Sequence, residues 1–203
     1  GLGDVTGIGL PGEKQGIIPS HEWKLANQGR VWTPGETVVS SIGQGYVLAT
    51  PLQLAVMTAR LANGKQAVAP RLVKSNGDAV PDFAPLDIDP YALAIIREGM
   101  FEVMNGRFGT ARNYNLDRSL GGMAGKTGTV QVKRITKAQR EVGIVNNIDR
   151  PWAERDHALF VAYAPVKRPR YAISVVVEHG GSGSSTAAPV ARDILTQLMQ
   201  KQG

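Results

Sequence analysis

Apolar residues recur at helical spacing in a segment that also carries helix start and stop signals. Thr50 is a suitable N-cap, Pro51 occupies the first helical position, and Gln53 completes a capping box. Asn63 and Gly64 supply the stop. The apolar face between them consists of Leu54, Met57, Thr58 and Leu61. The pattern predicts a helix over residues 51–63, which is the best-marked element of the chain.

Two more helices are predicted nearer the C-terminus. Asp89 and Pro90 have the same cap chemistry, and this helix runs to about Met104, before the stop signal at residues 105–106. Its apolar positions are Leu93, Ile96, Met100, Phe101 and Met104. The last helix opens at Thr186. We expect its apolar face to consist of Val190, Ile194, Leu195, Leu198 and Met199.

The hydrophobic period changes from helical to alternating in the final third of the chain. Alternation predicts a strand over residues 127–133, and two apolar runs predict strands over 158–164 and 171–178. The turn at 165–170 is short, so the last two strands should form an antiparallel hairpin. Helices, then strands, then a closing helix indicate an α+β domain with an antiparallel sheet flanked by helices.

Glycine, proline and serine mark the segments expected to lack regular structure. Residues 1–46 should be mostly loop, and residues 65–88 should hold a short extended piece (68–73) and a Pro-rich loop. A long polar, basic insertion covers 134–156, and the Gly/Ser segment 180–185 should be a flexible connection.

Length and composition are those of one globular domain, with 203 residues, 42% hydrophobic and 20% charged. No apolar run approaches the roughly 20 residues of a membrane helix, so we expect any membrane anchor to lie outside the chain. The absence of cysteine excludes disulfides, thiolate zinc sites and a cysteine nucleophile. No cofactor is expected. Each histidine should be a packed or surface residue rather than a metal ligand: His21, His157 and His179.

The formal net charge of +6 resides in one part of the chain. Residues 126–170 contain ten basic and four acidic side chains, and the rest of the chain balances. Such a stretch can attract nucleic acid, anionic lipid or an acidic ligand, or can be a solvated basic segment. Aromatic residues make up only 6% and do not interleave with the basic ones, so we expect no nucleic-acid partner.

A Gly-Lys-Thr-Gly-Thr run at residues 125–129 could carry chemistry in two ways. A phosphate-binding loop requires glycine at position 120 and a following helix, but Leu120 stands there and a strand pattern follows. The run therefore fits the Lys-Thr-Gly strand of penicillin-interacting serine enzymes better.

A strand with these residues can line a cleft. Lys126 supplies a fixed positive charge that attracts a carboxylate and controls the protonation of a neighbouring hydroxyl. Gly128 lets another element pack against the backbone. Thr127 and Thr129 point to one side, where their hydroxyls can bind a carboxylate. The Thr129 N–H can face a developing oxyanion, a contact worth roughly 3 kcal/mol in the transition state.

Several further motifs occur in a fixed order and are more specific than Lys-Thr-Gly alone. They lie at residues 6–13, 42–46, 49–53, 109–111, 124–132 and 156–165. Together they resemble the C-terminal half of the transpeptidase domain of class B penicillin-binding proteins, over nearly the whole chain. The resemblance implies a peptidoglycan D,D-transpeptidase that forms a serine acyl-enzyme with the D-Ala-D-Ala end of a stem peptide and is acylated by β-lactams.

The resemblance also implies site roles, partners and a location. Lys126 would pair with the hydroxyl of a Ser-x-Asn motif. Thr127, Gly128 and Thr129 would line the substrate site, with the Thr129 N–H as half of the oxyanion hole. Elongation-complex proteins, including a glycosyltransferase, would be partners. The protein would lie at the periplasmic face of the bacterial inner membrane, anchored by an N-terminal helix outside this chain.

One part of the family pattern is missing from the sequence. No serine is followed by lysine three residues on, and none by asparagine or aspartate two residues on. We therefore expect residues 1–203 to be the C-terminal portion of the domain, inactive alone, with the nucleophile and two sheet strands in a preceding N-terminal portion. An isolated chain should then be sticky or poorly stable. Two alternatives stay open: a non-catalytic β-lactam sensor or scaffold, and a D,D-carboxypeptidase or β-lactamase.

Overall fold

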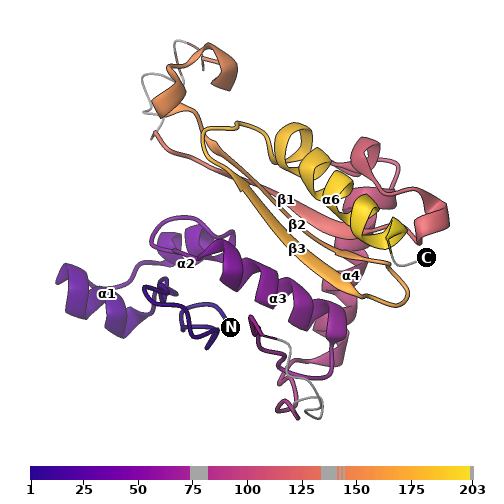
Figure 1. The fold of residues 1–203 in the computed structure, drawn as a ribbon. Helices are drawn as coiled ribbons and strands as arrows, with labels where there is room; N and C mark the ends of the chain where they lie inside the picture. The colour runs from indigo at the N-terminus through magenta and orange to yellow at the C-terminus, as the bar shows by residue number, and fades with distance from the viewer. Residues whose placement is uncertain (74–81, 134–140, 142, 144, 202–203) are drawn as a thin grey trace.

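Three antiparallel strands form the sheet, and helices pack on both of its faces (Figure 1). The strands are β1 (Ala124–Val130), β2 (His157–Ala164) and β3 (Tyr171–Val177), in the spatial order β1-β2-β3. This computed structural model describes residues 1–73, 82–133, 141, 143 and 145–201. The predicted α+β class and the antiparallel hairpin of β2 and β3 are confirmed.

The first strand begins and ends three residues earlier than the alternating pattern predicts. Ala124 pairs with Tyr163, and Val130 pairs with His157, the first residue of β2. No partner residue remains in the ladder beyond Val130, so residues 131–133 leave the sheet. The prediction of 127–133 was wrong because the buried start of the strand, Ala124 and Gly125, shows no alternation of polar and apolar residues.

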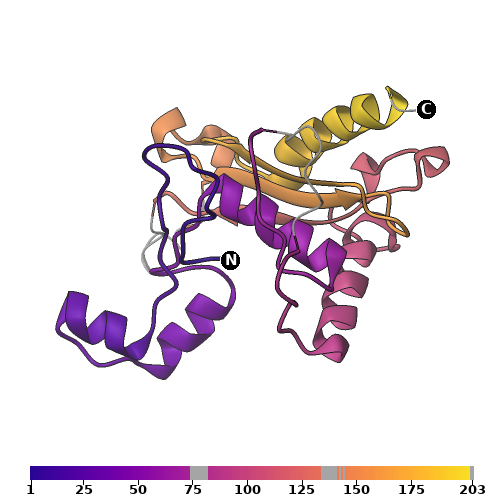
Figure 2. The same cartoon turned by 60° about the horizontal axis from the view of Figure 1, so that its bottom comes forward.

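Helices α3 (Pro51–Asn63) and α4 (Pro90–Asn105) lie on one side of the sheet, and α6 (Ala188–Gln200) lies on the other (Figure 2). A large core cluster joins the α6 side of the sheet to α6, with Phe160, Met123 and Leu195 at its centre. A smaller cluster on the α3 side includes Ala124 and Tyr163. The sheet is therefore covered on both faces, as the apolar character of β2 predicts.

The caps predicted for α3 and α4 are present. Thr50 and Gln53 exchange both capping-box hydrogen bonds, at 2.8 and 3.1 Å, and the Asp89 carboxylate accepts from Ala92 N–H. The predicted face of α3 is only partly correct, since the buried residues are Gln53, Val56, Thr58 and Ala62. On α4, Leu93, Met100 and Met104 are buried, whereas Ile96 is exposed.

Gln53 is buried because the N-terminal segment lies across the start of α3. Its side-chain amide donates to the carbonyls of Asp4 and Gln15, both at 2.7 Å. Gly16 is required at this crossing, since a Cβ there would lie within 3 Å of the Gln53 side chain. The capping residue therefore also fastens the first 16 residues to the domain.

Residues 1–46 are mostly loop, as predicted, but two short helices that the sequence pattern does not predict lie within them. These are α1 (His21–Gln28) and α2 (Pro34–Ser41), which form a lobe beside the sheet (Figure 2). Ser20 caps α1, and Thr33 with Glu36 forms a capping box at α2. An ion pair 2.6 Å long between the buried Lys24 and the partly exposed Glu36 joins the two helices.

The second half of the Gly/Ser segment 180–185 belongs to a helical turn rather than to a flexible connection. The turn η5 (Gly183–Ala187) leads directly into α6, so helical structure begins before the predicted start at Thr186. The Thr186 hydroxyl donates to the Gly180 carbonyl at 2.8 Å. On α6, Leu195 is buried, but Val190, Ile194 and Leu198 of the predicted apolar face are each at least 40% exposed.

Two segments are described only in part. The expected extended piece at 68–73 is not a strand; the nearest pairing is a single bridge between Gln66 and Pro85, and residues 74–81 lie outside the described part. Part of the basic insertion 134–156, namely residues 134–140, 142 and 144, also lies outside it. Within the described residues, no helix has the length and apolar character required to cross a bilayer.

Candidate functional site

The Lys-Thr-Gly-Thr run forms the outer edge of the sheet. β1 pairs only with β2 in the described sheet, so its other edge is open to neighbouring loops. Thr127 lies opposite Phe160, and Thr129 opposite Ala158, which places both threonines on the α6 side of the sheet. Lys126 lies opposite Val161 and therefore on the other side. The predicted alternation of these side chains is confirmed.

Lys126 is exposed and held close to the strand. Its ammonium group donates to the carbonyl oxygen of Thr127 at 2.8 Å. No acidic side chain forms an ion pair with it in the part of the chain that the structure describes. The site therefore presents a lysine charge that is free to meet an anionic group at the strand edge.

The Gly-Thr-Ala motif at 109–111 places a second hydroxyl against the strand. The Oγ1 atoms of Thr110 and Thr127 are 3.3 Å apart. Gly109 lies against the end of α4, where a Cβ would meet the carbonyls of Glu102 and Val103. Ala111 is buried and its N–H donates to the Val103 carbonyl at 3.1 Å. Glycine and alanine thus fasten the loop to α4, and the threonine between them contacts β1.

The Gly-Gln-Gly-Tyr motif approaches the same strand from the α1–α2 lobe. Gly43 and Gly45 both have φ of 74°, a left-handed conformation that favours glycine. The Gln44 side-chain amide between them lies 3.5 Å from the Thr129 carbonyl oxygen. Tyr46 packs on Trp23 of α1, with ring centroids 5.3 Å apart. The motif therefore links the lobe to the end of β1.

Gly183 of the η5 turn packs directly against the backbone of Gly128. A Cβ at Gly183 would lie within 3 Å of the carbonyl oxygens of Gly128 and Leu159, and 3.0 Å from the Gly128 nitrogen. The sequence correctly predicts that an element packs at Gly128. It does not identify that element, because the Gly/Ser segment was interpreted as flexible.

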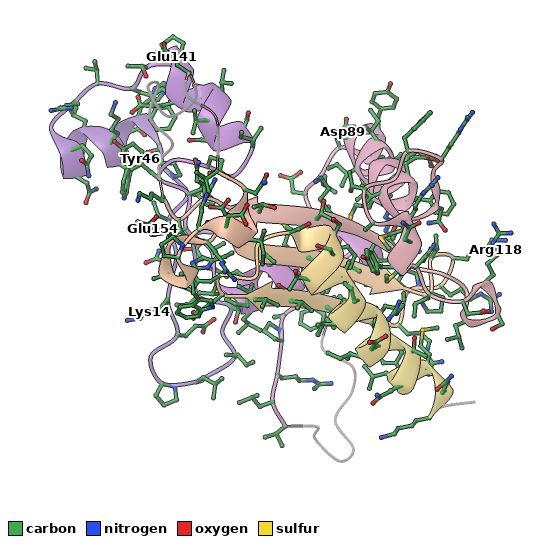
Figure 3. The ribbon with its side chains drawn as sticks, turned by 90° about the horizontal axis from the view of Figure 1, so that it is seen from above. Lys14, Tyr46, Asp89, Arg118, Glu141 and Glu154 are labelled. Atoms are coloured by element: carbon green, nitrogen blue, oxygen red, sulfur yellow. The ribbon has the colours of Figure 1, made fainter. Side chains whose placement is uncertain are left out.

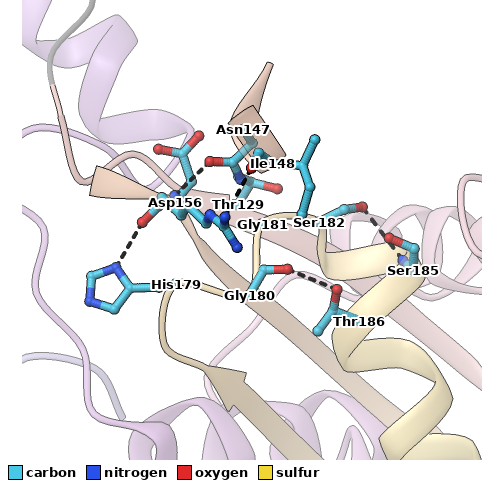
Figure 4. A pocket seen from close by; sticks show the side chains of 11 residues that line it. Thr129, Asn147, Ile148, Asp156, His179, Gly180, Gly181, Ser182, Ser185 and Thr186 are labelled. Carbon is cyan, nitrogen blue, oxygen red and sulfur yellow. Dashed lines mark hydrogen bonds between the residues drawn. The ribbon is translucent and has the colours of Figure 1, made fainter. Parts of the chain in front are cut away.

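A hollow of about 460 Å³ opens at the Thr129 end of β1 (Figure 4). Its walls come from the end of the β1–β2 connection and from the segment between β3 and α6. They include Thr129, Asn147, Asp156, His179, Ser182 and Ser185. Arg150 pairs with Asp156 at 3.4 Å, and the Asn147 side chain accepts from the Asp156 N–H at 3.0 Å. Polar groups thus order the wall beside Thr129.

Two histidines that are far apart in sequence meet at this hollow, which one of them, His179, lines. The His179 N–H donates to Nδ1 of His157 at 2.9 Å, and the two rings are 4.7 Å apart. The His179 ring also contacts the Arg155 carbonyl and stacks against Trp152. Both are packed residues, as predicted. The described residues contain no group of three His, Cys, Asp or Glu side chains suited to a metal ion.

Comparison with known proteins identifies the family. The model of the penicillin binding protein transpeptidase domain matches residues 1–196. The peptidoglycan D,D-transpeptidase MrdA of Acinetobacter baumannii is 38% identical over 94% of this chain, and that of Haemophilus influenzae is 36% identical over all of it. The chain spans 29% and 32% of those two relatives, about a third of their length.

Solved structures agree with this match. PBP2 of Pseudomonas aeruginosa, crystallised with WCK 5153, superposes with a TM-score of 0.78 at 38% identity, over 98% of this chain and 40% of that one. PBP2 of Helicobacter pylori, in a complex with MreC, gives a TM-score of 0.80 at 33% identity, over 98% and 34%. The class expected from the motifs is confirmed: the chain belongs to the penicillin-binding protein transpeptidase family and is similar to PBP2.

Proposed function

We propose that this chain is the C-terminal portion of the transpeptidase domain of a peptidoglycan D,D-transpeptidase. The observation that carries the proposal is the partly exposed strand edge Lys126–Thr129, where Thr110 contacts Thr127 and Gly183 packs on Gly128. The relatives that match over nearly the whole chain are D,D-transpeptidases, which supports the same assignment.

The reaction proceeds in two steps through a serine that precedes residue 1. The serine oxygen attacks the carbonyl of the penultimate D-Ala, an ester forms, and the terminal D-Ala leaves with a proton on its amine. The amine of a neighbouring stem peptide then attacks the ester, forms the cross-linking amide and frees the serine. The Ser-x-x-Lys and Ser-x-Asn/Asp motifs lie in the same preceding portion.

This chain contributes one wall of the shared site. Lys126, exposed and without an acidic partner in the described residues, holds a positive charge beside the serine hydroxyl of Ser-x-Asn. The hydroxyls of Thr127 and Thr129 bind the terminal carboxylate through charge-assisted hydrogen bonds. The Thr129 N–H stabilises the oxyanion, a contribution of about 3 kcal/mol that corresponds to 10²–10³ in rate.

The family membership also supports a cellular setting. The protein acts at the periplasmic face of the inner membrane, anchored by a helix that precedes this chain, and β-lactams acylate its serine. It requires no cofactor and binds no nucleic acid. A similar protein, the Helicobacter pylori PBP2, has been solved with MreC. Elongation-complex proteins, including a glycosyltransferase, are therefore proposed as its partners.

Intact-mass spectrometry before and after incubation with penicillin tests the proposal. We expect the full protein that contains this chain to gain one penicillin mass, and proteolysis to place the adduct outside residues 1–203. An adduct within residues 1–203 would refute the proposed division of the site. Complete loss of the adduct by hydrolysis within minutes would instead indicate a β-lactamase, and no adduct at all would indicate a scaffold.

A variant pair tests the role of the lysine. Lys126→Met should slow penicillin acylation by 10²–10³, because the charge beside the reacting hydroxyl is lost. Lys14→Met is the matched control, since Lys14 is exposed on the N-terminal segment and should acylate at the wild-type rate. Equal rates for Lys126→Met and the wild type would contradict the proposed role.

A further inference from the structure

A second hollow lies at the end of β1 opposite to Thr129. It has a volume of about 780 Å³ and opens between the end of α4, the residues that precede β1, and the β2–β3 turn. We call it the basic hollow, and it is lined by Phe101, Asn105, Arg118, Gly121, Gly122, Pro165, Val166, Lys167 and Arg168. None of the residues used in the proposed reaction lines it.

The frame of the basic hollow is tightly built. Gly121 has a φ of 83°, and a Cβ at this position would lie 2.7 Å from the Pro165 side chain. The Val166 N–H donates to the Gly121 carbonyl at 3.2 Å. The Asn105 side chain donates to the Met123 carbonyl at 3.2 Å. Because these contacts fix all three walls, a ligand would meet a preformed cavity and lose little binding energy to ordering it.

The rim carries three positive charges without acidic partners. Arg118, Lys167 and Arg168 are exposed, and none forms an ion pair within the described residues. Among the described residues, no acidic side chain lines the hollow. Asp117 is adjacent to Arg118 in sequence, but its carboxylate accepts from the Ser119 N–H at 2.7 Å. Figure 3 shows Arg118 projecting from the end of the molecule that lies away from the α1–α2 lobe.

The floor is apolar, and it disfavours a buried anion. Phe101 and Val166 are partly buried and pack on the smaller core cluster. Phe101 and Asn105 also belong to the last turn of α4, where the helix dipole places partial negative charge. A ligand that fits both features therefore carries its negative charges at the rim and an apolar group in the floor.

We propose that the basic hollow binds an acidic peptide segment of a partner protein, with one apolar side chain seated in the floor. Arginine binds carboxylates through two parallel hydrogen bonds, which two of the three rim cations can supply. The volume lies within the range of cavities that enclose a small ligand or a few residues. A lipid surface would instead require apolar side chains that protrude, whereas those of Phe101 and Val166 are recessed.

Isothermal titration calorimetry on the full protein tests this proposal without reference to acylation. The probe is a capped heptapeptide with one leucine between six glutamates, and the comparison peptide has serine in place of leucine. We expect the leucine peptide to bind, the serine peptide to bind more weakly, and both affinities to fall with added salt. Arg168→Glu should weaken binding of the leucine peptide at least tenfold, and Lys14→Glu less than twofold.

Comparison of the Arg168→Glu and Lys14→Glu variants distinguishes a specific binding site from nonspecific electrostatic attraction to a chain of net charge +6. Both substitutions change the charge by two, and Lys14 lies far from Arg118 at the other side of the molecule (Figure 3). Equal weakening by the two variants would overturn the proposal, as would absence of peptide binding at millimolar concentration. Binding to phosphatidylglycerol vesicles that Arg168→Glu abolishes, without peptide binding, would overturn it in favour of a lipid surface.

Discussion

Substitution of Gly183 by alanine should disturb the candidate site by forcing the η5 turn away from the backbone of β1 and β2. The added Cβ would lie within 3 Å of two carbonyl oxygens, those of Gly128 and Leu159. Carbon–oxygen contacts need about 3.3 Å, so the η5 turn and the two strands must separate by several tenths of an ångström to roughly 1 Å. All the opposing atoms are backbone, and no side chain can rotate away to relieve the clash.

The magnitude follows from two opposing effects. Overpacking of this kind destabilises the folded state by about 1–3 kcal/mol, whereas alanine in a helical turn stabilises it by about 0.5–1 kcal/mol relative to glycine. We therefore expect the free energy of unfolding to fall by roughly 1–2 kcal/mol. A displacement of about 1 Å at a catalytic strand can cost about 10² in rate, so penicillin acylation should slow far more than the loss of stability explains.

Chemical denaturation and stopped-flow acylation on the full protein measure the two effects. Gly99→Ala is the matched control, because Gly99 lies in α4 with no heavy atom within 4 Å of an added Cβ. The free energy of unfolding of this control should rise by about 0.5–1 kcal/mol, and the control should be acylated at the wild-type rate. If Gly183→Ala were as stable and as fast as the wild type, the packing of η5 on β1 would not position the site.

Two further outcomes test contacts around the site and in the lobe. Thr110→Val should slow penicillin acylation by about two- to tenfold, because the Thr127 hydroxyl loses its partner at 3.3 Å. Thr110→Ser keeps a hydroxyl and should restore the rate. An unchanged rate for the valine variant would exclude this positioning role. Hydrogen bonds from Lys24 and Thr33 hold the pKa of Glu36 below its ordinary value of about 4.3. The stabilisation by Glu36 is therefore present above that value and is lost as the pH falls through the lowered pKa. Glu36→Gln should lower Tm at pH 7 and flatten the fall of Tm in acid, as scanning calorimetry would show; an unchanged slope would contradict the assignment.

Elements with complete local signals are predictable from the sequence. The caps at Thr50 and Asp89 fix the starts of α3 and α4, because capping depends on residues within one turn. The same Thr-Pro-x-Glu chemistry stands at Thr33, but the surrounding glycines favoured a loop interpretation. There the ion pair between Lys24 and Glu36 joins two short helices, and a contact of that kind has no periodic signature.

The candidate site likewise contains residues that local sequence signals predict and contacts that only the fold reveals. Lys126, Thr127 and Thr129 are identified by a short motif and by strand alternation, both of which are local. The contact of Thr110 with Thr127 spans 17 residues, and that of Gln44 with Thr129 spans 85. These pairs depend on how loops return to the edge of the sheet. The motifs mark the residues involved, but only the fold shows which atoms meet.

The exposed side of α6 leads to a final prediction about the isolated chain. Val190, Ile194 and Leu198 are each at least 40% exposed and lie on one stripe at four-residue spacing. Full burial of such a side chain is worth about 1.5–3 kcal/mol, so covering the remaining surface of all three should contribute roughly 2–3 kcal/mol.

A 203-residue protein without a cover for this stripe should therefore self-associate. Light scattering coupled to size exclusion should detect oligomers of the isolated chain. Replacement of all three side chains by glutamine should reduce them, because the charge is unchanged and only apolar surface is removed. Addition of the preceding portion of the domain should give a monodisperse species. A monomeric wild-type chain at high concentration would show that the α6 stripe needs no partner, and the inference that other residues of the domain cover it would then fail.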